Sequence, residues 1–122
     1  MTVSFGTTSW GWQMMHDFSG QIVVVTGASQ GLGAATARAF AECGANVCAN
    51  YLADSQRNNL DALEQWRADA GLNADQVVPF AADVSDSSAV NEMFARIGEQ
   101  FAEIDVLVNN AGINRDHTIA KM

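Results

Sequence analysis

The sequence contains few of the residues that build metal sites, disulfide scaffolds or rigid turns. Its 122 residues include two cysteines, two histidines and one proline. Cys43 and Cys48 stand far from His16 and His117, so no metal-ligand spacing is present. We expect both cysteines to be reduced thiols that pack as small hydrophobic residues.

Basic residues are also scarce, with six Lys and Arg against 14 Asp and Glu and a net charge of −8. They are scattered along the chain, so no positive cluster can pair with a phosphate backbone, and nucleic acid is not an expected partner. No apolar run approaches the roughly 20 residues that a membrane helix needs. The N-terminus lacks the basic and apolar segments of a secretory signal, so we expect a cytoplasmic protein without membrane contact.

A strand followed by a glycine-rich turn is the most informative stretch. Ile22–Val25 is a run of four β-branched residues, which predicts a strand buried on both faces. Gly27, Gly31 and Gly33 follow, and the alanine-rich run 34–41 predicts a helix. Because a helix N-terminus offers unpaired N–H groups and partial positive charge, this order predicts a phosphate-binding turn. An ordinary tight turn between strand and helix is the alternative.

The rest of the chain alternates between strand and helix patterns. Further strands are predicted at 46–51, 76–82 and 104–109, and helices at about 31–43, 55–70 and 86–101. This alternation predicts an α/β fold with a parallel sheet and right-handed crossovers. By analogy with the doubly wound Rossmann fold we expect strand order 3-2-1-4, the first half of that fold. Residues 21–122 form this domain, and residues 1–20 are expected to be an irregular extension, in which Trp10 and Trp12 could alternatively dock a partner.

Each predicted helix carries an apolar stripe, and the second and third also have a candidate N-cap. Asp54 or Ser55 is expected to cap the second helix, and Ser85 or Asp86 the third. The stripes consist of Leu32, Ala35, Ala39 and Phe40 in the first helix, Leu60, Leu63 and Trp66 in the second, and Val90, Met93, Phe94, Ile97 and Phe101 in the third.

The turn has the spacing Thr-Gly-x-x-x-Gly-x-Gly and resembles that of the short-chain dehydrogenase/reductase family. Asp83-Val84 and Asn109-Asn110-Ala111-Gly112, which end the third and fourth strands, match two further motifs of that family. Locally, each of these also reads as a plain turn. The resemblance implies a nicotinamide dinucleotide held by the residues Gly27, Ala28, Ser29, Gln30, Gly31, Leu32, Gly33, Asn50, Tyr51, Asp83, Val84, Asn110, Ala111 and Gly112.

The end of the second strand bears on the choice of cofactor. NAD-specific sites place a carboxylate there to hold the ribose 2′-hydroxyl, whereas this chain has Asn50 and Tyr51. We therefore favour NADP, with Arg57 as a distant counter-charge for the 2′-phosphate. NAD stays open, because Asp54 could fold back towards the ribose and Gln30 stands where many NADP-dependent members carry arginine.

The segment 104–122, with Gly-Ile-x-Arg-Asp followed by Lys-Met, is similar to β-ketoacyl-acyl-carrier-protein reductases and acetoacetyl-CoA reductases. This resemblance implies reduction of a 3-oxoacyl thioester with NADPH, as in fatty acid biosynthesis, by an enzyme that is usually a homo-oligomer. It also implies a catalytic Ser, Tyr, Lys and relay Asn beyond residue 122. Tyr51, the one tyrosine, lacks the lysine partner, so no catalytic residue is expected in this chain.

We accordingly interpret the sequence as the N-terminal, cofactor-binding part of a reductase. A non-catalytic nucleotide-binding or interaction module with this fold is the alternative. In a sheet that stops at the fourth strand, Val106–Val108 would form an exposed apolar edge, which predicts self-association.

Overall fold

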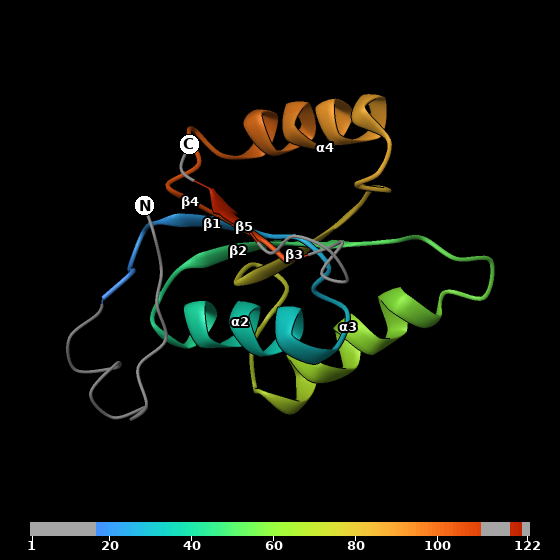
Figure 1. Cartoon of the computed structure of the whole chain (residues 1–122). Coiled ribbons are helices and arrows are strands. Elements are labelled where there is room, and N and C mark those ends of the chain that lie inside the picture. The colour runs from blue at the N-terminus through green and yellow to red at the C-terminus, as the bar shows by residue number, and fades with distance from the viewer. Residues whose placement is uncertain (1–16, 111–117, 121–122) are drawn as a thin grey trace.

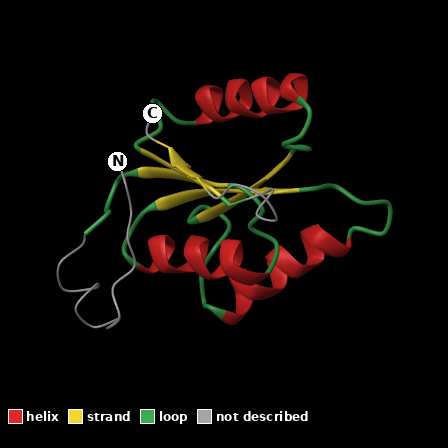
Figure 2. Cartoon of the chain, in the orientation of Figure 1, coloured by secondary structure: helices red, strands yellow, loops and turns green. Residues whose placement is uncertain are grey.

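The computed structural model describes residues 17–110 and 118–120. Its elements are β1 (Ile22–Val25), α2 (Gly31–Glu42), β2 (Asn46–Tyr51), α3 (Asn58–Asp69), β3 (Val77–Ala81), α4 (Ser87–Gln100), β4 (Val106–Asn109) and β5 (Thr118–Ala120). The sheet lies between α4 on one side and α2 and α3 on the other, so the fold has three layers (Figures 1 and 2). Trp10, Trp12, Ala111 and Gly112 lie outside the described residues.

The strand order is β3-β2-β1-β4-β5, and the first four strands are parallel. The predicted order 3-2-1-4 is therefore confirmed. The expected open edge at 106–108 is wrong, because β4 pairs with the antiparallel β5. In this pairing Leu107 lies opposite Ala120 and Val108 opposite Ile119. The backbone groups of β4 that would have been unpaired are thus used in a ladder.

The core has two parts, one on each face of the sheet. Val23 and Val25 face the α2 and α3 side, whereas Ile22 and Val24 face the α4 side. All four are buried, as the β-branched run predicts. Phe18 packs edge-to-face on Phe40, with ring centroids 5.0 Å apart. The packed part of the chain therefore begins before β1.

The buried face of α2 differs from the prediction. Leu32 is 61% exposed, and Ala35 is also exposed. The buried residues are Gly33, Thr36, Ala37, Phe40 and Ala41. These have the i, i+3, i+4, i+7, i+8 spacing of a helix face, but they include a glycine and a threonine. Phe40 of the predicted stripe is buried as expected. The other buried residues are small and allow close approach to the sheet, and hydrophobicity alone did not select them.

Aspartates cap α3 and α4, as predicted. The Asp54 carboxylate accepts hydrogen bonds from the backbone N–H groups of Asn58 (3.0 Å) and Asn59 (3.0 Å). Asp86 accepts from Ser88 N–H at 2.9 Å. Helix α3 begins later than predicted because Arg57 has a left-handed backbone conformation, with φ +62°. In the part of the chain that the structure describes, no helix has the length and apolarity to span a bilayer.

Candidate nucleotide-binding site

Each glycine of the turn between β1 and α2 has a separate physical reason. Gly27 has φ +63° and Gly31 has φ +64°, backbone conformations that side chains with a Cβ rarely adopt. Gly33 has ordinary helical geometry, but a Cβ there would collide with the carbonyl oxygen of Gly27 and lie 2.7 Å from Nδ2 of Asn110. The backbone conformation therefore favours glycine at positions 27 and 31, and sterics require it at position 33.

The N-terminus of α2 has no side-chain cap. Gln30 stands at the N-cap in extended conformation and makes no capping hydrogen bond, and the first turn contains no acidic residue. The first N–H groups of a helix have no partner within the helix and carry partial positive charge. Behind a glycine turn, these groups form a site for an anion such as a phosphate.

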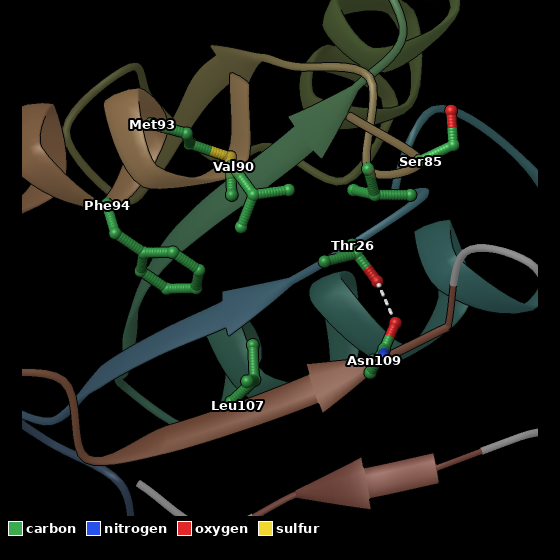
Figure 3. Close-up of a pocket in the computed structure, with 8 residues that line it drawn as sticks. Thr26, Ser85, Val90, Met93, Phe94, Leu107 and Asn109 are labelled. Carbon is green, nitrogen blue, oxygen red and sulfur yellow. Dashed lines mark hydrogen bonds between the residues drawn. The ribbon is translucent and has the colours of Figure 1, made fainter. Parts of the chain in front are cut away.

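A hydrogen-bonded junction joins the ends of β1 and β4 beside this turn. Thr26, which is 5% exposed, donates through Oγ1 to Oδ1 of Asn109 at 3.1 Å (Figure 3) and accepts from the backbone N–H of Asn110 at 2.8 Å. Nδ2 of Asn110 donates to the carbonyl oxygen of Gly27 at 3.4 Å. The strand order reverses between β1 and β4, the point at which doubly wound sheets bind their ligands. Asn110, predicted as a cofactor-contacting residue, thus lies against the glycine turn.

Asn50 lies at the same edge, but its side chain points into the protein. It is 2% exposed, and its Oδ1 accepts from the backbone N–H of Gly27 at 3.0 Å. Its Nδ2 donates to the carbonyl oxygens of Phe80 (3.3 Å) and Ala82 (3.1 Å), and lies 3.5 Å from Sδ of Met93. These contacts use the donors and acceptor of the amide within the protein. Asn50 therefore ties the glycine turn to the end of β3.

No carboxylate is available at the described end of β2. Tyr51 is half-buried and Leu52 is 53% exposed. Both carboxylate oxygens of Asp54 are occupied by the first turn of α3, and the backbone N–H of Asn59 is the main cause that lowers the pKa of Asp54. The sequence left open whether Asp54 folds back towards a ribose, and the structure instead places it at the start of α3.

Arg57, the suggested counter-charge, pairs with two carboxylates of its own helix. Its Nη2 lies 3.3 Å from Asp61 and 3.2 Å from Glu64. The Arg57 side chain is 62% exposed, so these pairs contribute little to stability.

Asp83 forms a local turn at the carboxyl end of β3. Its Oδ1 accepts from Oγ of Ser85 at 2.6 Å and from the backbone N–H of Ser85 at 2.9 Å. Both bonds lower the pKa of Asp83, and the bond from the Ser85 hydroxyl has the larger effect. Asp83 is exposed at the same edge of the sheet as the glycine turn, and its turn leads into α4.

A pocket of about 330 Å³ opens between this edge and α4 (Figure 3). It is lined by Thr26, Val84, Ser85, Val90, Met93, Phe94, Leu107 and Asn109. Among the predicted site residues that the structure describes, only Val84 lines it. The residues from α4 were assigned to the core from their helical spacing, and the sequence carries no signal that part of this stripe borders an open space. Thr26 and Asn109 belong to the family motifs but were not predicted as site residues.

The remaining predicted residues belong to the turn itself and to the first turn of α2. Ala28 is fully buried, Ser29 is half-buried, and Gln30, Gly31 and Leu32 are exposed. Among the described residues, no three His, Cys, Asp or Glu side chains gather in an arrangement that could hold a metal ion.

The parallel sheet, the uncapped helix behind a glycine turn and the polar junction at the point of strand reversal define a doubly wound nucleotide-binding domain. The family pattern described as short chain dehydrogenase matches residues 21–122. The chain belongs to that family, whose members bind a nicotinamide dinucleotide.

Named relatives share this region. The chain is 38% identical over 103 residues to 3-oxoacyl-[acyl-carrier-protein] reductase FabG of Thermotoga maritima, covering 84% of this chain and 39% of that protein. It is 44% identical over 102 residues to 3beta-hydroxysteroid dehydrogenase 1 of Eggerthella lenta, covering 82% of this chain and 36% of that protein. The NADP-containing structure of the N-domain of a bacterial malonyl-CoA reductase superposes with a TM-score of 0.71 at 29% identity, covering 78% of this chain and 17% of the other. The chain thus spans well under half the length of these relatives.

Proposed function

We propose that the carboxyl edge of the sheet binds NADP, with the pyrophosphate at the N-terminus of α2. The observation that carries this proposal is the uncapped helix behind a turn in which each glycine has a structural reason. The backbone N–H groups of residues 31–33 would donate to the phosphate oxygens. The side chain of Asn110, already directed at the turn, would line the adjoining part of the site.

The end of β2 supports NADP rather than NAD. A carboxylate that accepts from a ribose 2′-hydroxyl would repel a 2′-phosphate. Asn50 points inward, Tyr51 and Leu52 are uncharged, and Asp54 is engaged by α3. Because the surface pairs of Arg57 are weak, its guanidinium remains able to turn towards a 2′-phosphate.

We assign the adenine to the neighbouring strand end. Asp83 has one carboxylate oxygen that is not used by Ser85, and this oxygen would accept from the adenine amino group. Val84, at the rim of the pocket, offers an apolar surface for the ring. The motif residues Ala111 and Gly112, which lie outside the described part of the chain, stay predictions for the same part of the cofactor.

We further propose that this region serves as the cofactor-binding part of a reductase that converts 3-oxoacyl thioesters to 3-hydroxyacyl thioesters. Bound NADPH would supply the hydride. The names of two relatives, both 3-oxoacyl-[acyl-carrier-protein] reductases, support this substrate class, as does the sequence of residues 112–122. The hydroxysteroid relative carries the same region with a different named substrate, so the shared region supports the cofactor more directly than the substrate.

Calorimetric titration of the 122-residue chain with NADPH and NADH tests the cofactor. We expect binding of both, with NADPH the tighter. Tighter binding of NADH would overturn the choice of NADP, and absence of binding by either would overturn the site itself. The circular dichroism melt of the same sample separates a folded chain that does not bind from one that is unfolded.

The product of the complete reading frame tests the substrate class. We expect NADPH oxidation with acetoacetyl-CoA, and little or none with a 3-ketosteroid. The reverse preference would overturn the thioester assignment without affecting the cofactor assignment, because both reactions consume the same dinucleotide.

A further inference from the structure

A tryptophan from α3 reaches the glycine turn. The indole Nε1–H of Trp66 donates to the carbonyl oxygen of Ala28 at 2.9 Å, across 38 positions of sequence. The Trp66 ring is half-buried against the core on the α2 and α3 side, one turn of helix after the fully buried Leu63. The ring is therefore held by packing, and its N–H group is presented to the turn in a fixed direction.

The other side of the turn is held by β2. The backbone N–H of Ala28 donates to the carbonyl oxygen of Asn50 at 2.8 Å, and the N–H of Gly27 donates to Oδ1 of Asn50 at 3.0 Å. Together with the indole bond, these contacts fix the polar backbone groups of Gly27 and Ala28 towards the protein from two directions. The residues that follow then enter α2 with their own N–H groups unpaired.

We propose that Trp66 is a positioning residue for the dinucleotide, acting through the carbonyl of Ala28. This inference rests on the proposed function. Glycine at positions 27 and 31 gives the turn its left-handed conformations. Glycine also has more conformational freedom to lose than any other residue, so ordering this turn has a high entropic cost. A donor anchored on α3 restricts that freedom before the cofactor arrives, so that less ordering is needed on binding.

Trp66 could have two roles: its ring fills space in the core, and its N–H group holds the turn. The Trp66→Phe variant tests the two roles, because phenylalanine retains an aromatic ring at this position and removes the N–H donor. It also removes part of the buried ring area, so a control that loses only apolar packing is needed. Phe101→Leu is the matched control. Phe101 ends α4 and packs on the other core, away from the turn, so this variant loses buried apolar area without touching the proposed site.

The first measurement needs no cofactor. Amide hydrogen exchange, measured residue by residue on the free 122-residue chain, should be about 3- to 10-fold faster at Ala28 in Trp66→Phe than in the wild type. In this variant the exchange rates of α4 amides should be unchanged. In Phe101→Leu the α4 amides should exchange faster, and the rate at Ala28 should be unchanged. Unchanged exchange at Ala28 would overturn the proposal. In the wild type, the Trp66 indole proton should itself be protected from exchange, and an unprotected proton would overturn the proposal without any variant.

The second measurement is the NADPH dissociation constant, which should rise about 3- to 10-fold in Trp66→Phe and stay within 2-fold of the wild type in Phe101→Leu. Equal weakening in both variants, or in neither, would overturn the positioning role. If the wild type itself does not bind NADPH, the proposed function fails, while the exchange experiment still decides whether Trp66 holds the turn.

Discussion

The α-carbon of Gly33 lies so close to the carbonyl oxygen of Gly27 that a methyl group would not fit between them. The two residues belong to one turn, yet they come from the end of β1 and the first turn of α2. Their contact lets α2 start directly against the strand. It also sets the distance between the helix N-terminus and the polar junction formed by Thr26 and Asn110.

We predict that Gly33→Ala lowers both the stability and the dinucleotide affinity of the chain. The added methyl group must push backbone against backbone, which costs about 1–3 kcal/mol or more in a well-packed site. Gly98→Ala is the matched control, because Gly98 is also a helical glycine but has no atom within 4 Å of its Cβ position. That substitution should stabilise the chain by about 0.5–1 kcal/mol. Thermal melts and NADPH titrations of both variants provide the test, and equal melting temperatures would contradict the steric argument.

The structure predicts different results for two adjacent substitutions at the end of β2. Asn50→Asp should destabilise the fold, because a carboxylate oxygen would replace the Nδ2 donor that faces the carbonyls of Phe80 and Ala82. Tyr51→Asp should leave the fold intact and shift preference from NADPH towards NADH, because it places the carboxylate on the half-buried residue instead. The ratio of the two dissociation constants is the readout. A stable Asn50→Asp variant that prefers NADH would contradict the inward orientation of Asn50.

The order of elements could be predicted from sequence because the β-branched run of β1 and the glycine spacing each have few structural solutions. The buried face of α2 was predicted correctly only at Phe40. Leu32 is more hydrophobic than Gly33 or Thr36, but close contact with the sheet selects small residues, and Leu32 stays exposed. A hydrophobicity pattern describes transfer from water and contains no information on how near two backbones must come.

The polar contacts of the site show a second limit. Asn50 was placed at the correct edge, but which face of the strand its side chain occupies depends on register. It shares the α4 side with Cys48, two positions earlier, and contacts Met93. The bond between Trp66 and Ala28 joins residues 38 positions apart, and helical spacing in α3 predicts burial of the ring without predicting a partner for its N–H.

Asp54 should make the start of α3 sensitive to acid. Its pKa is lowered in the folded chain, chiefly by the backbone N–H of Asn59. A lowered pKa stabilises the fold above the unfolded value of about 3.9, and this contribution is lost as the pH falls through the folded value. The difference in melting temperature between wild type and Asp54→Ala should therefore be constant from about pH 7 to pH 5 and shrink below about pH 4. A difference that does not change with pH would contradict the charged cap.

Cys48 should be inert to thiol reagents until the chain unfolds. Burial raises the pKa of its thiol to about 12, so almost no thiolate exists at neutral pH. In a Cys43→Ala variant, labelling by a disulfide reagent should follow the unfolding rate, whereas a Cys48→Ala variant should be labelled at the half-buried Cys43 without unfolding. Because the folded pKa is raised, this thiol stabilises the fold below the unfolded value of about 8.5, and the contribution is lost as the pH rises from there towards 12.

Strand β3 is the other edge of the sheet, and its outward backbone groups are largely occupied. The backbone N–H of Val47 in β2 donates to the carbonyl of Gln76, so Gln76 and every second residue after it direct their backbone groups towards β2. The backbone groups of the alternate residues, Val77, Pro79 and Ala81, therefore point to the open side of β3. Proline offers no N–H group, and the N–H of Val77 donates back to Asn73 at 3.3 Å. Two arginines cover carbonyls from opposite layers. Arg67 of α3 donates to Val77 at 3.1 Å and Arg96 of α4 donates to Ala81 at 2.8 Å.

We therefore predict that Arg67→Ala combined with Arg96→Ala makes the chain self-associate through β3, since two carbonyls become available to a strand of another copy. Arg38→Ala combined with Arg57→Ala is the control. It also removes two positive charges, but the side chains of these arginines pair with carboxylates on helix surfaces. Sedimentation velocity at matched concentration should show larger species for the first double variant alone. Association of both would implicate the change in net charge, and association of neither would mean that Pro79 and the Asn73 bond protect the edge without the arginines.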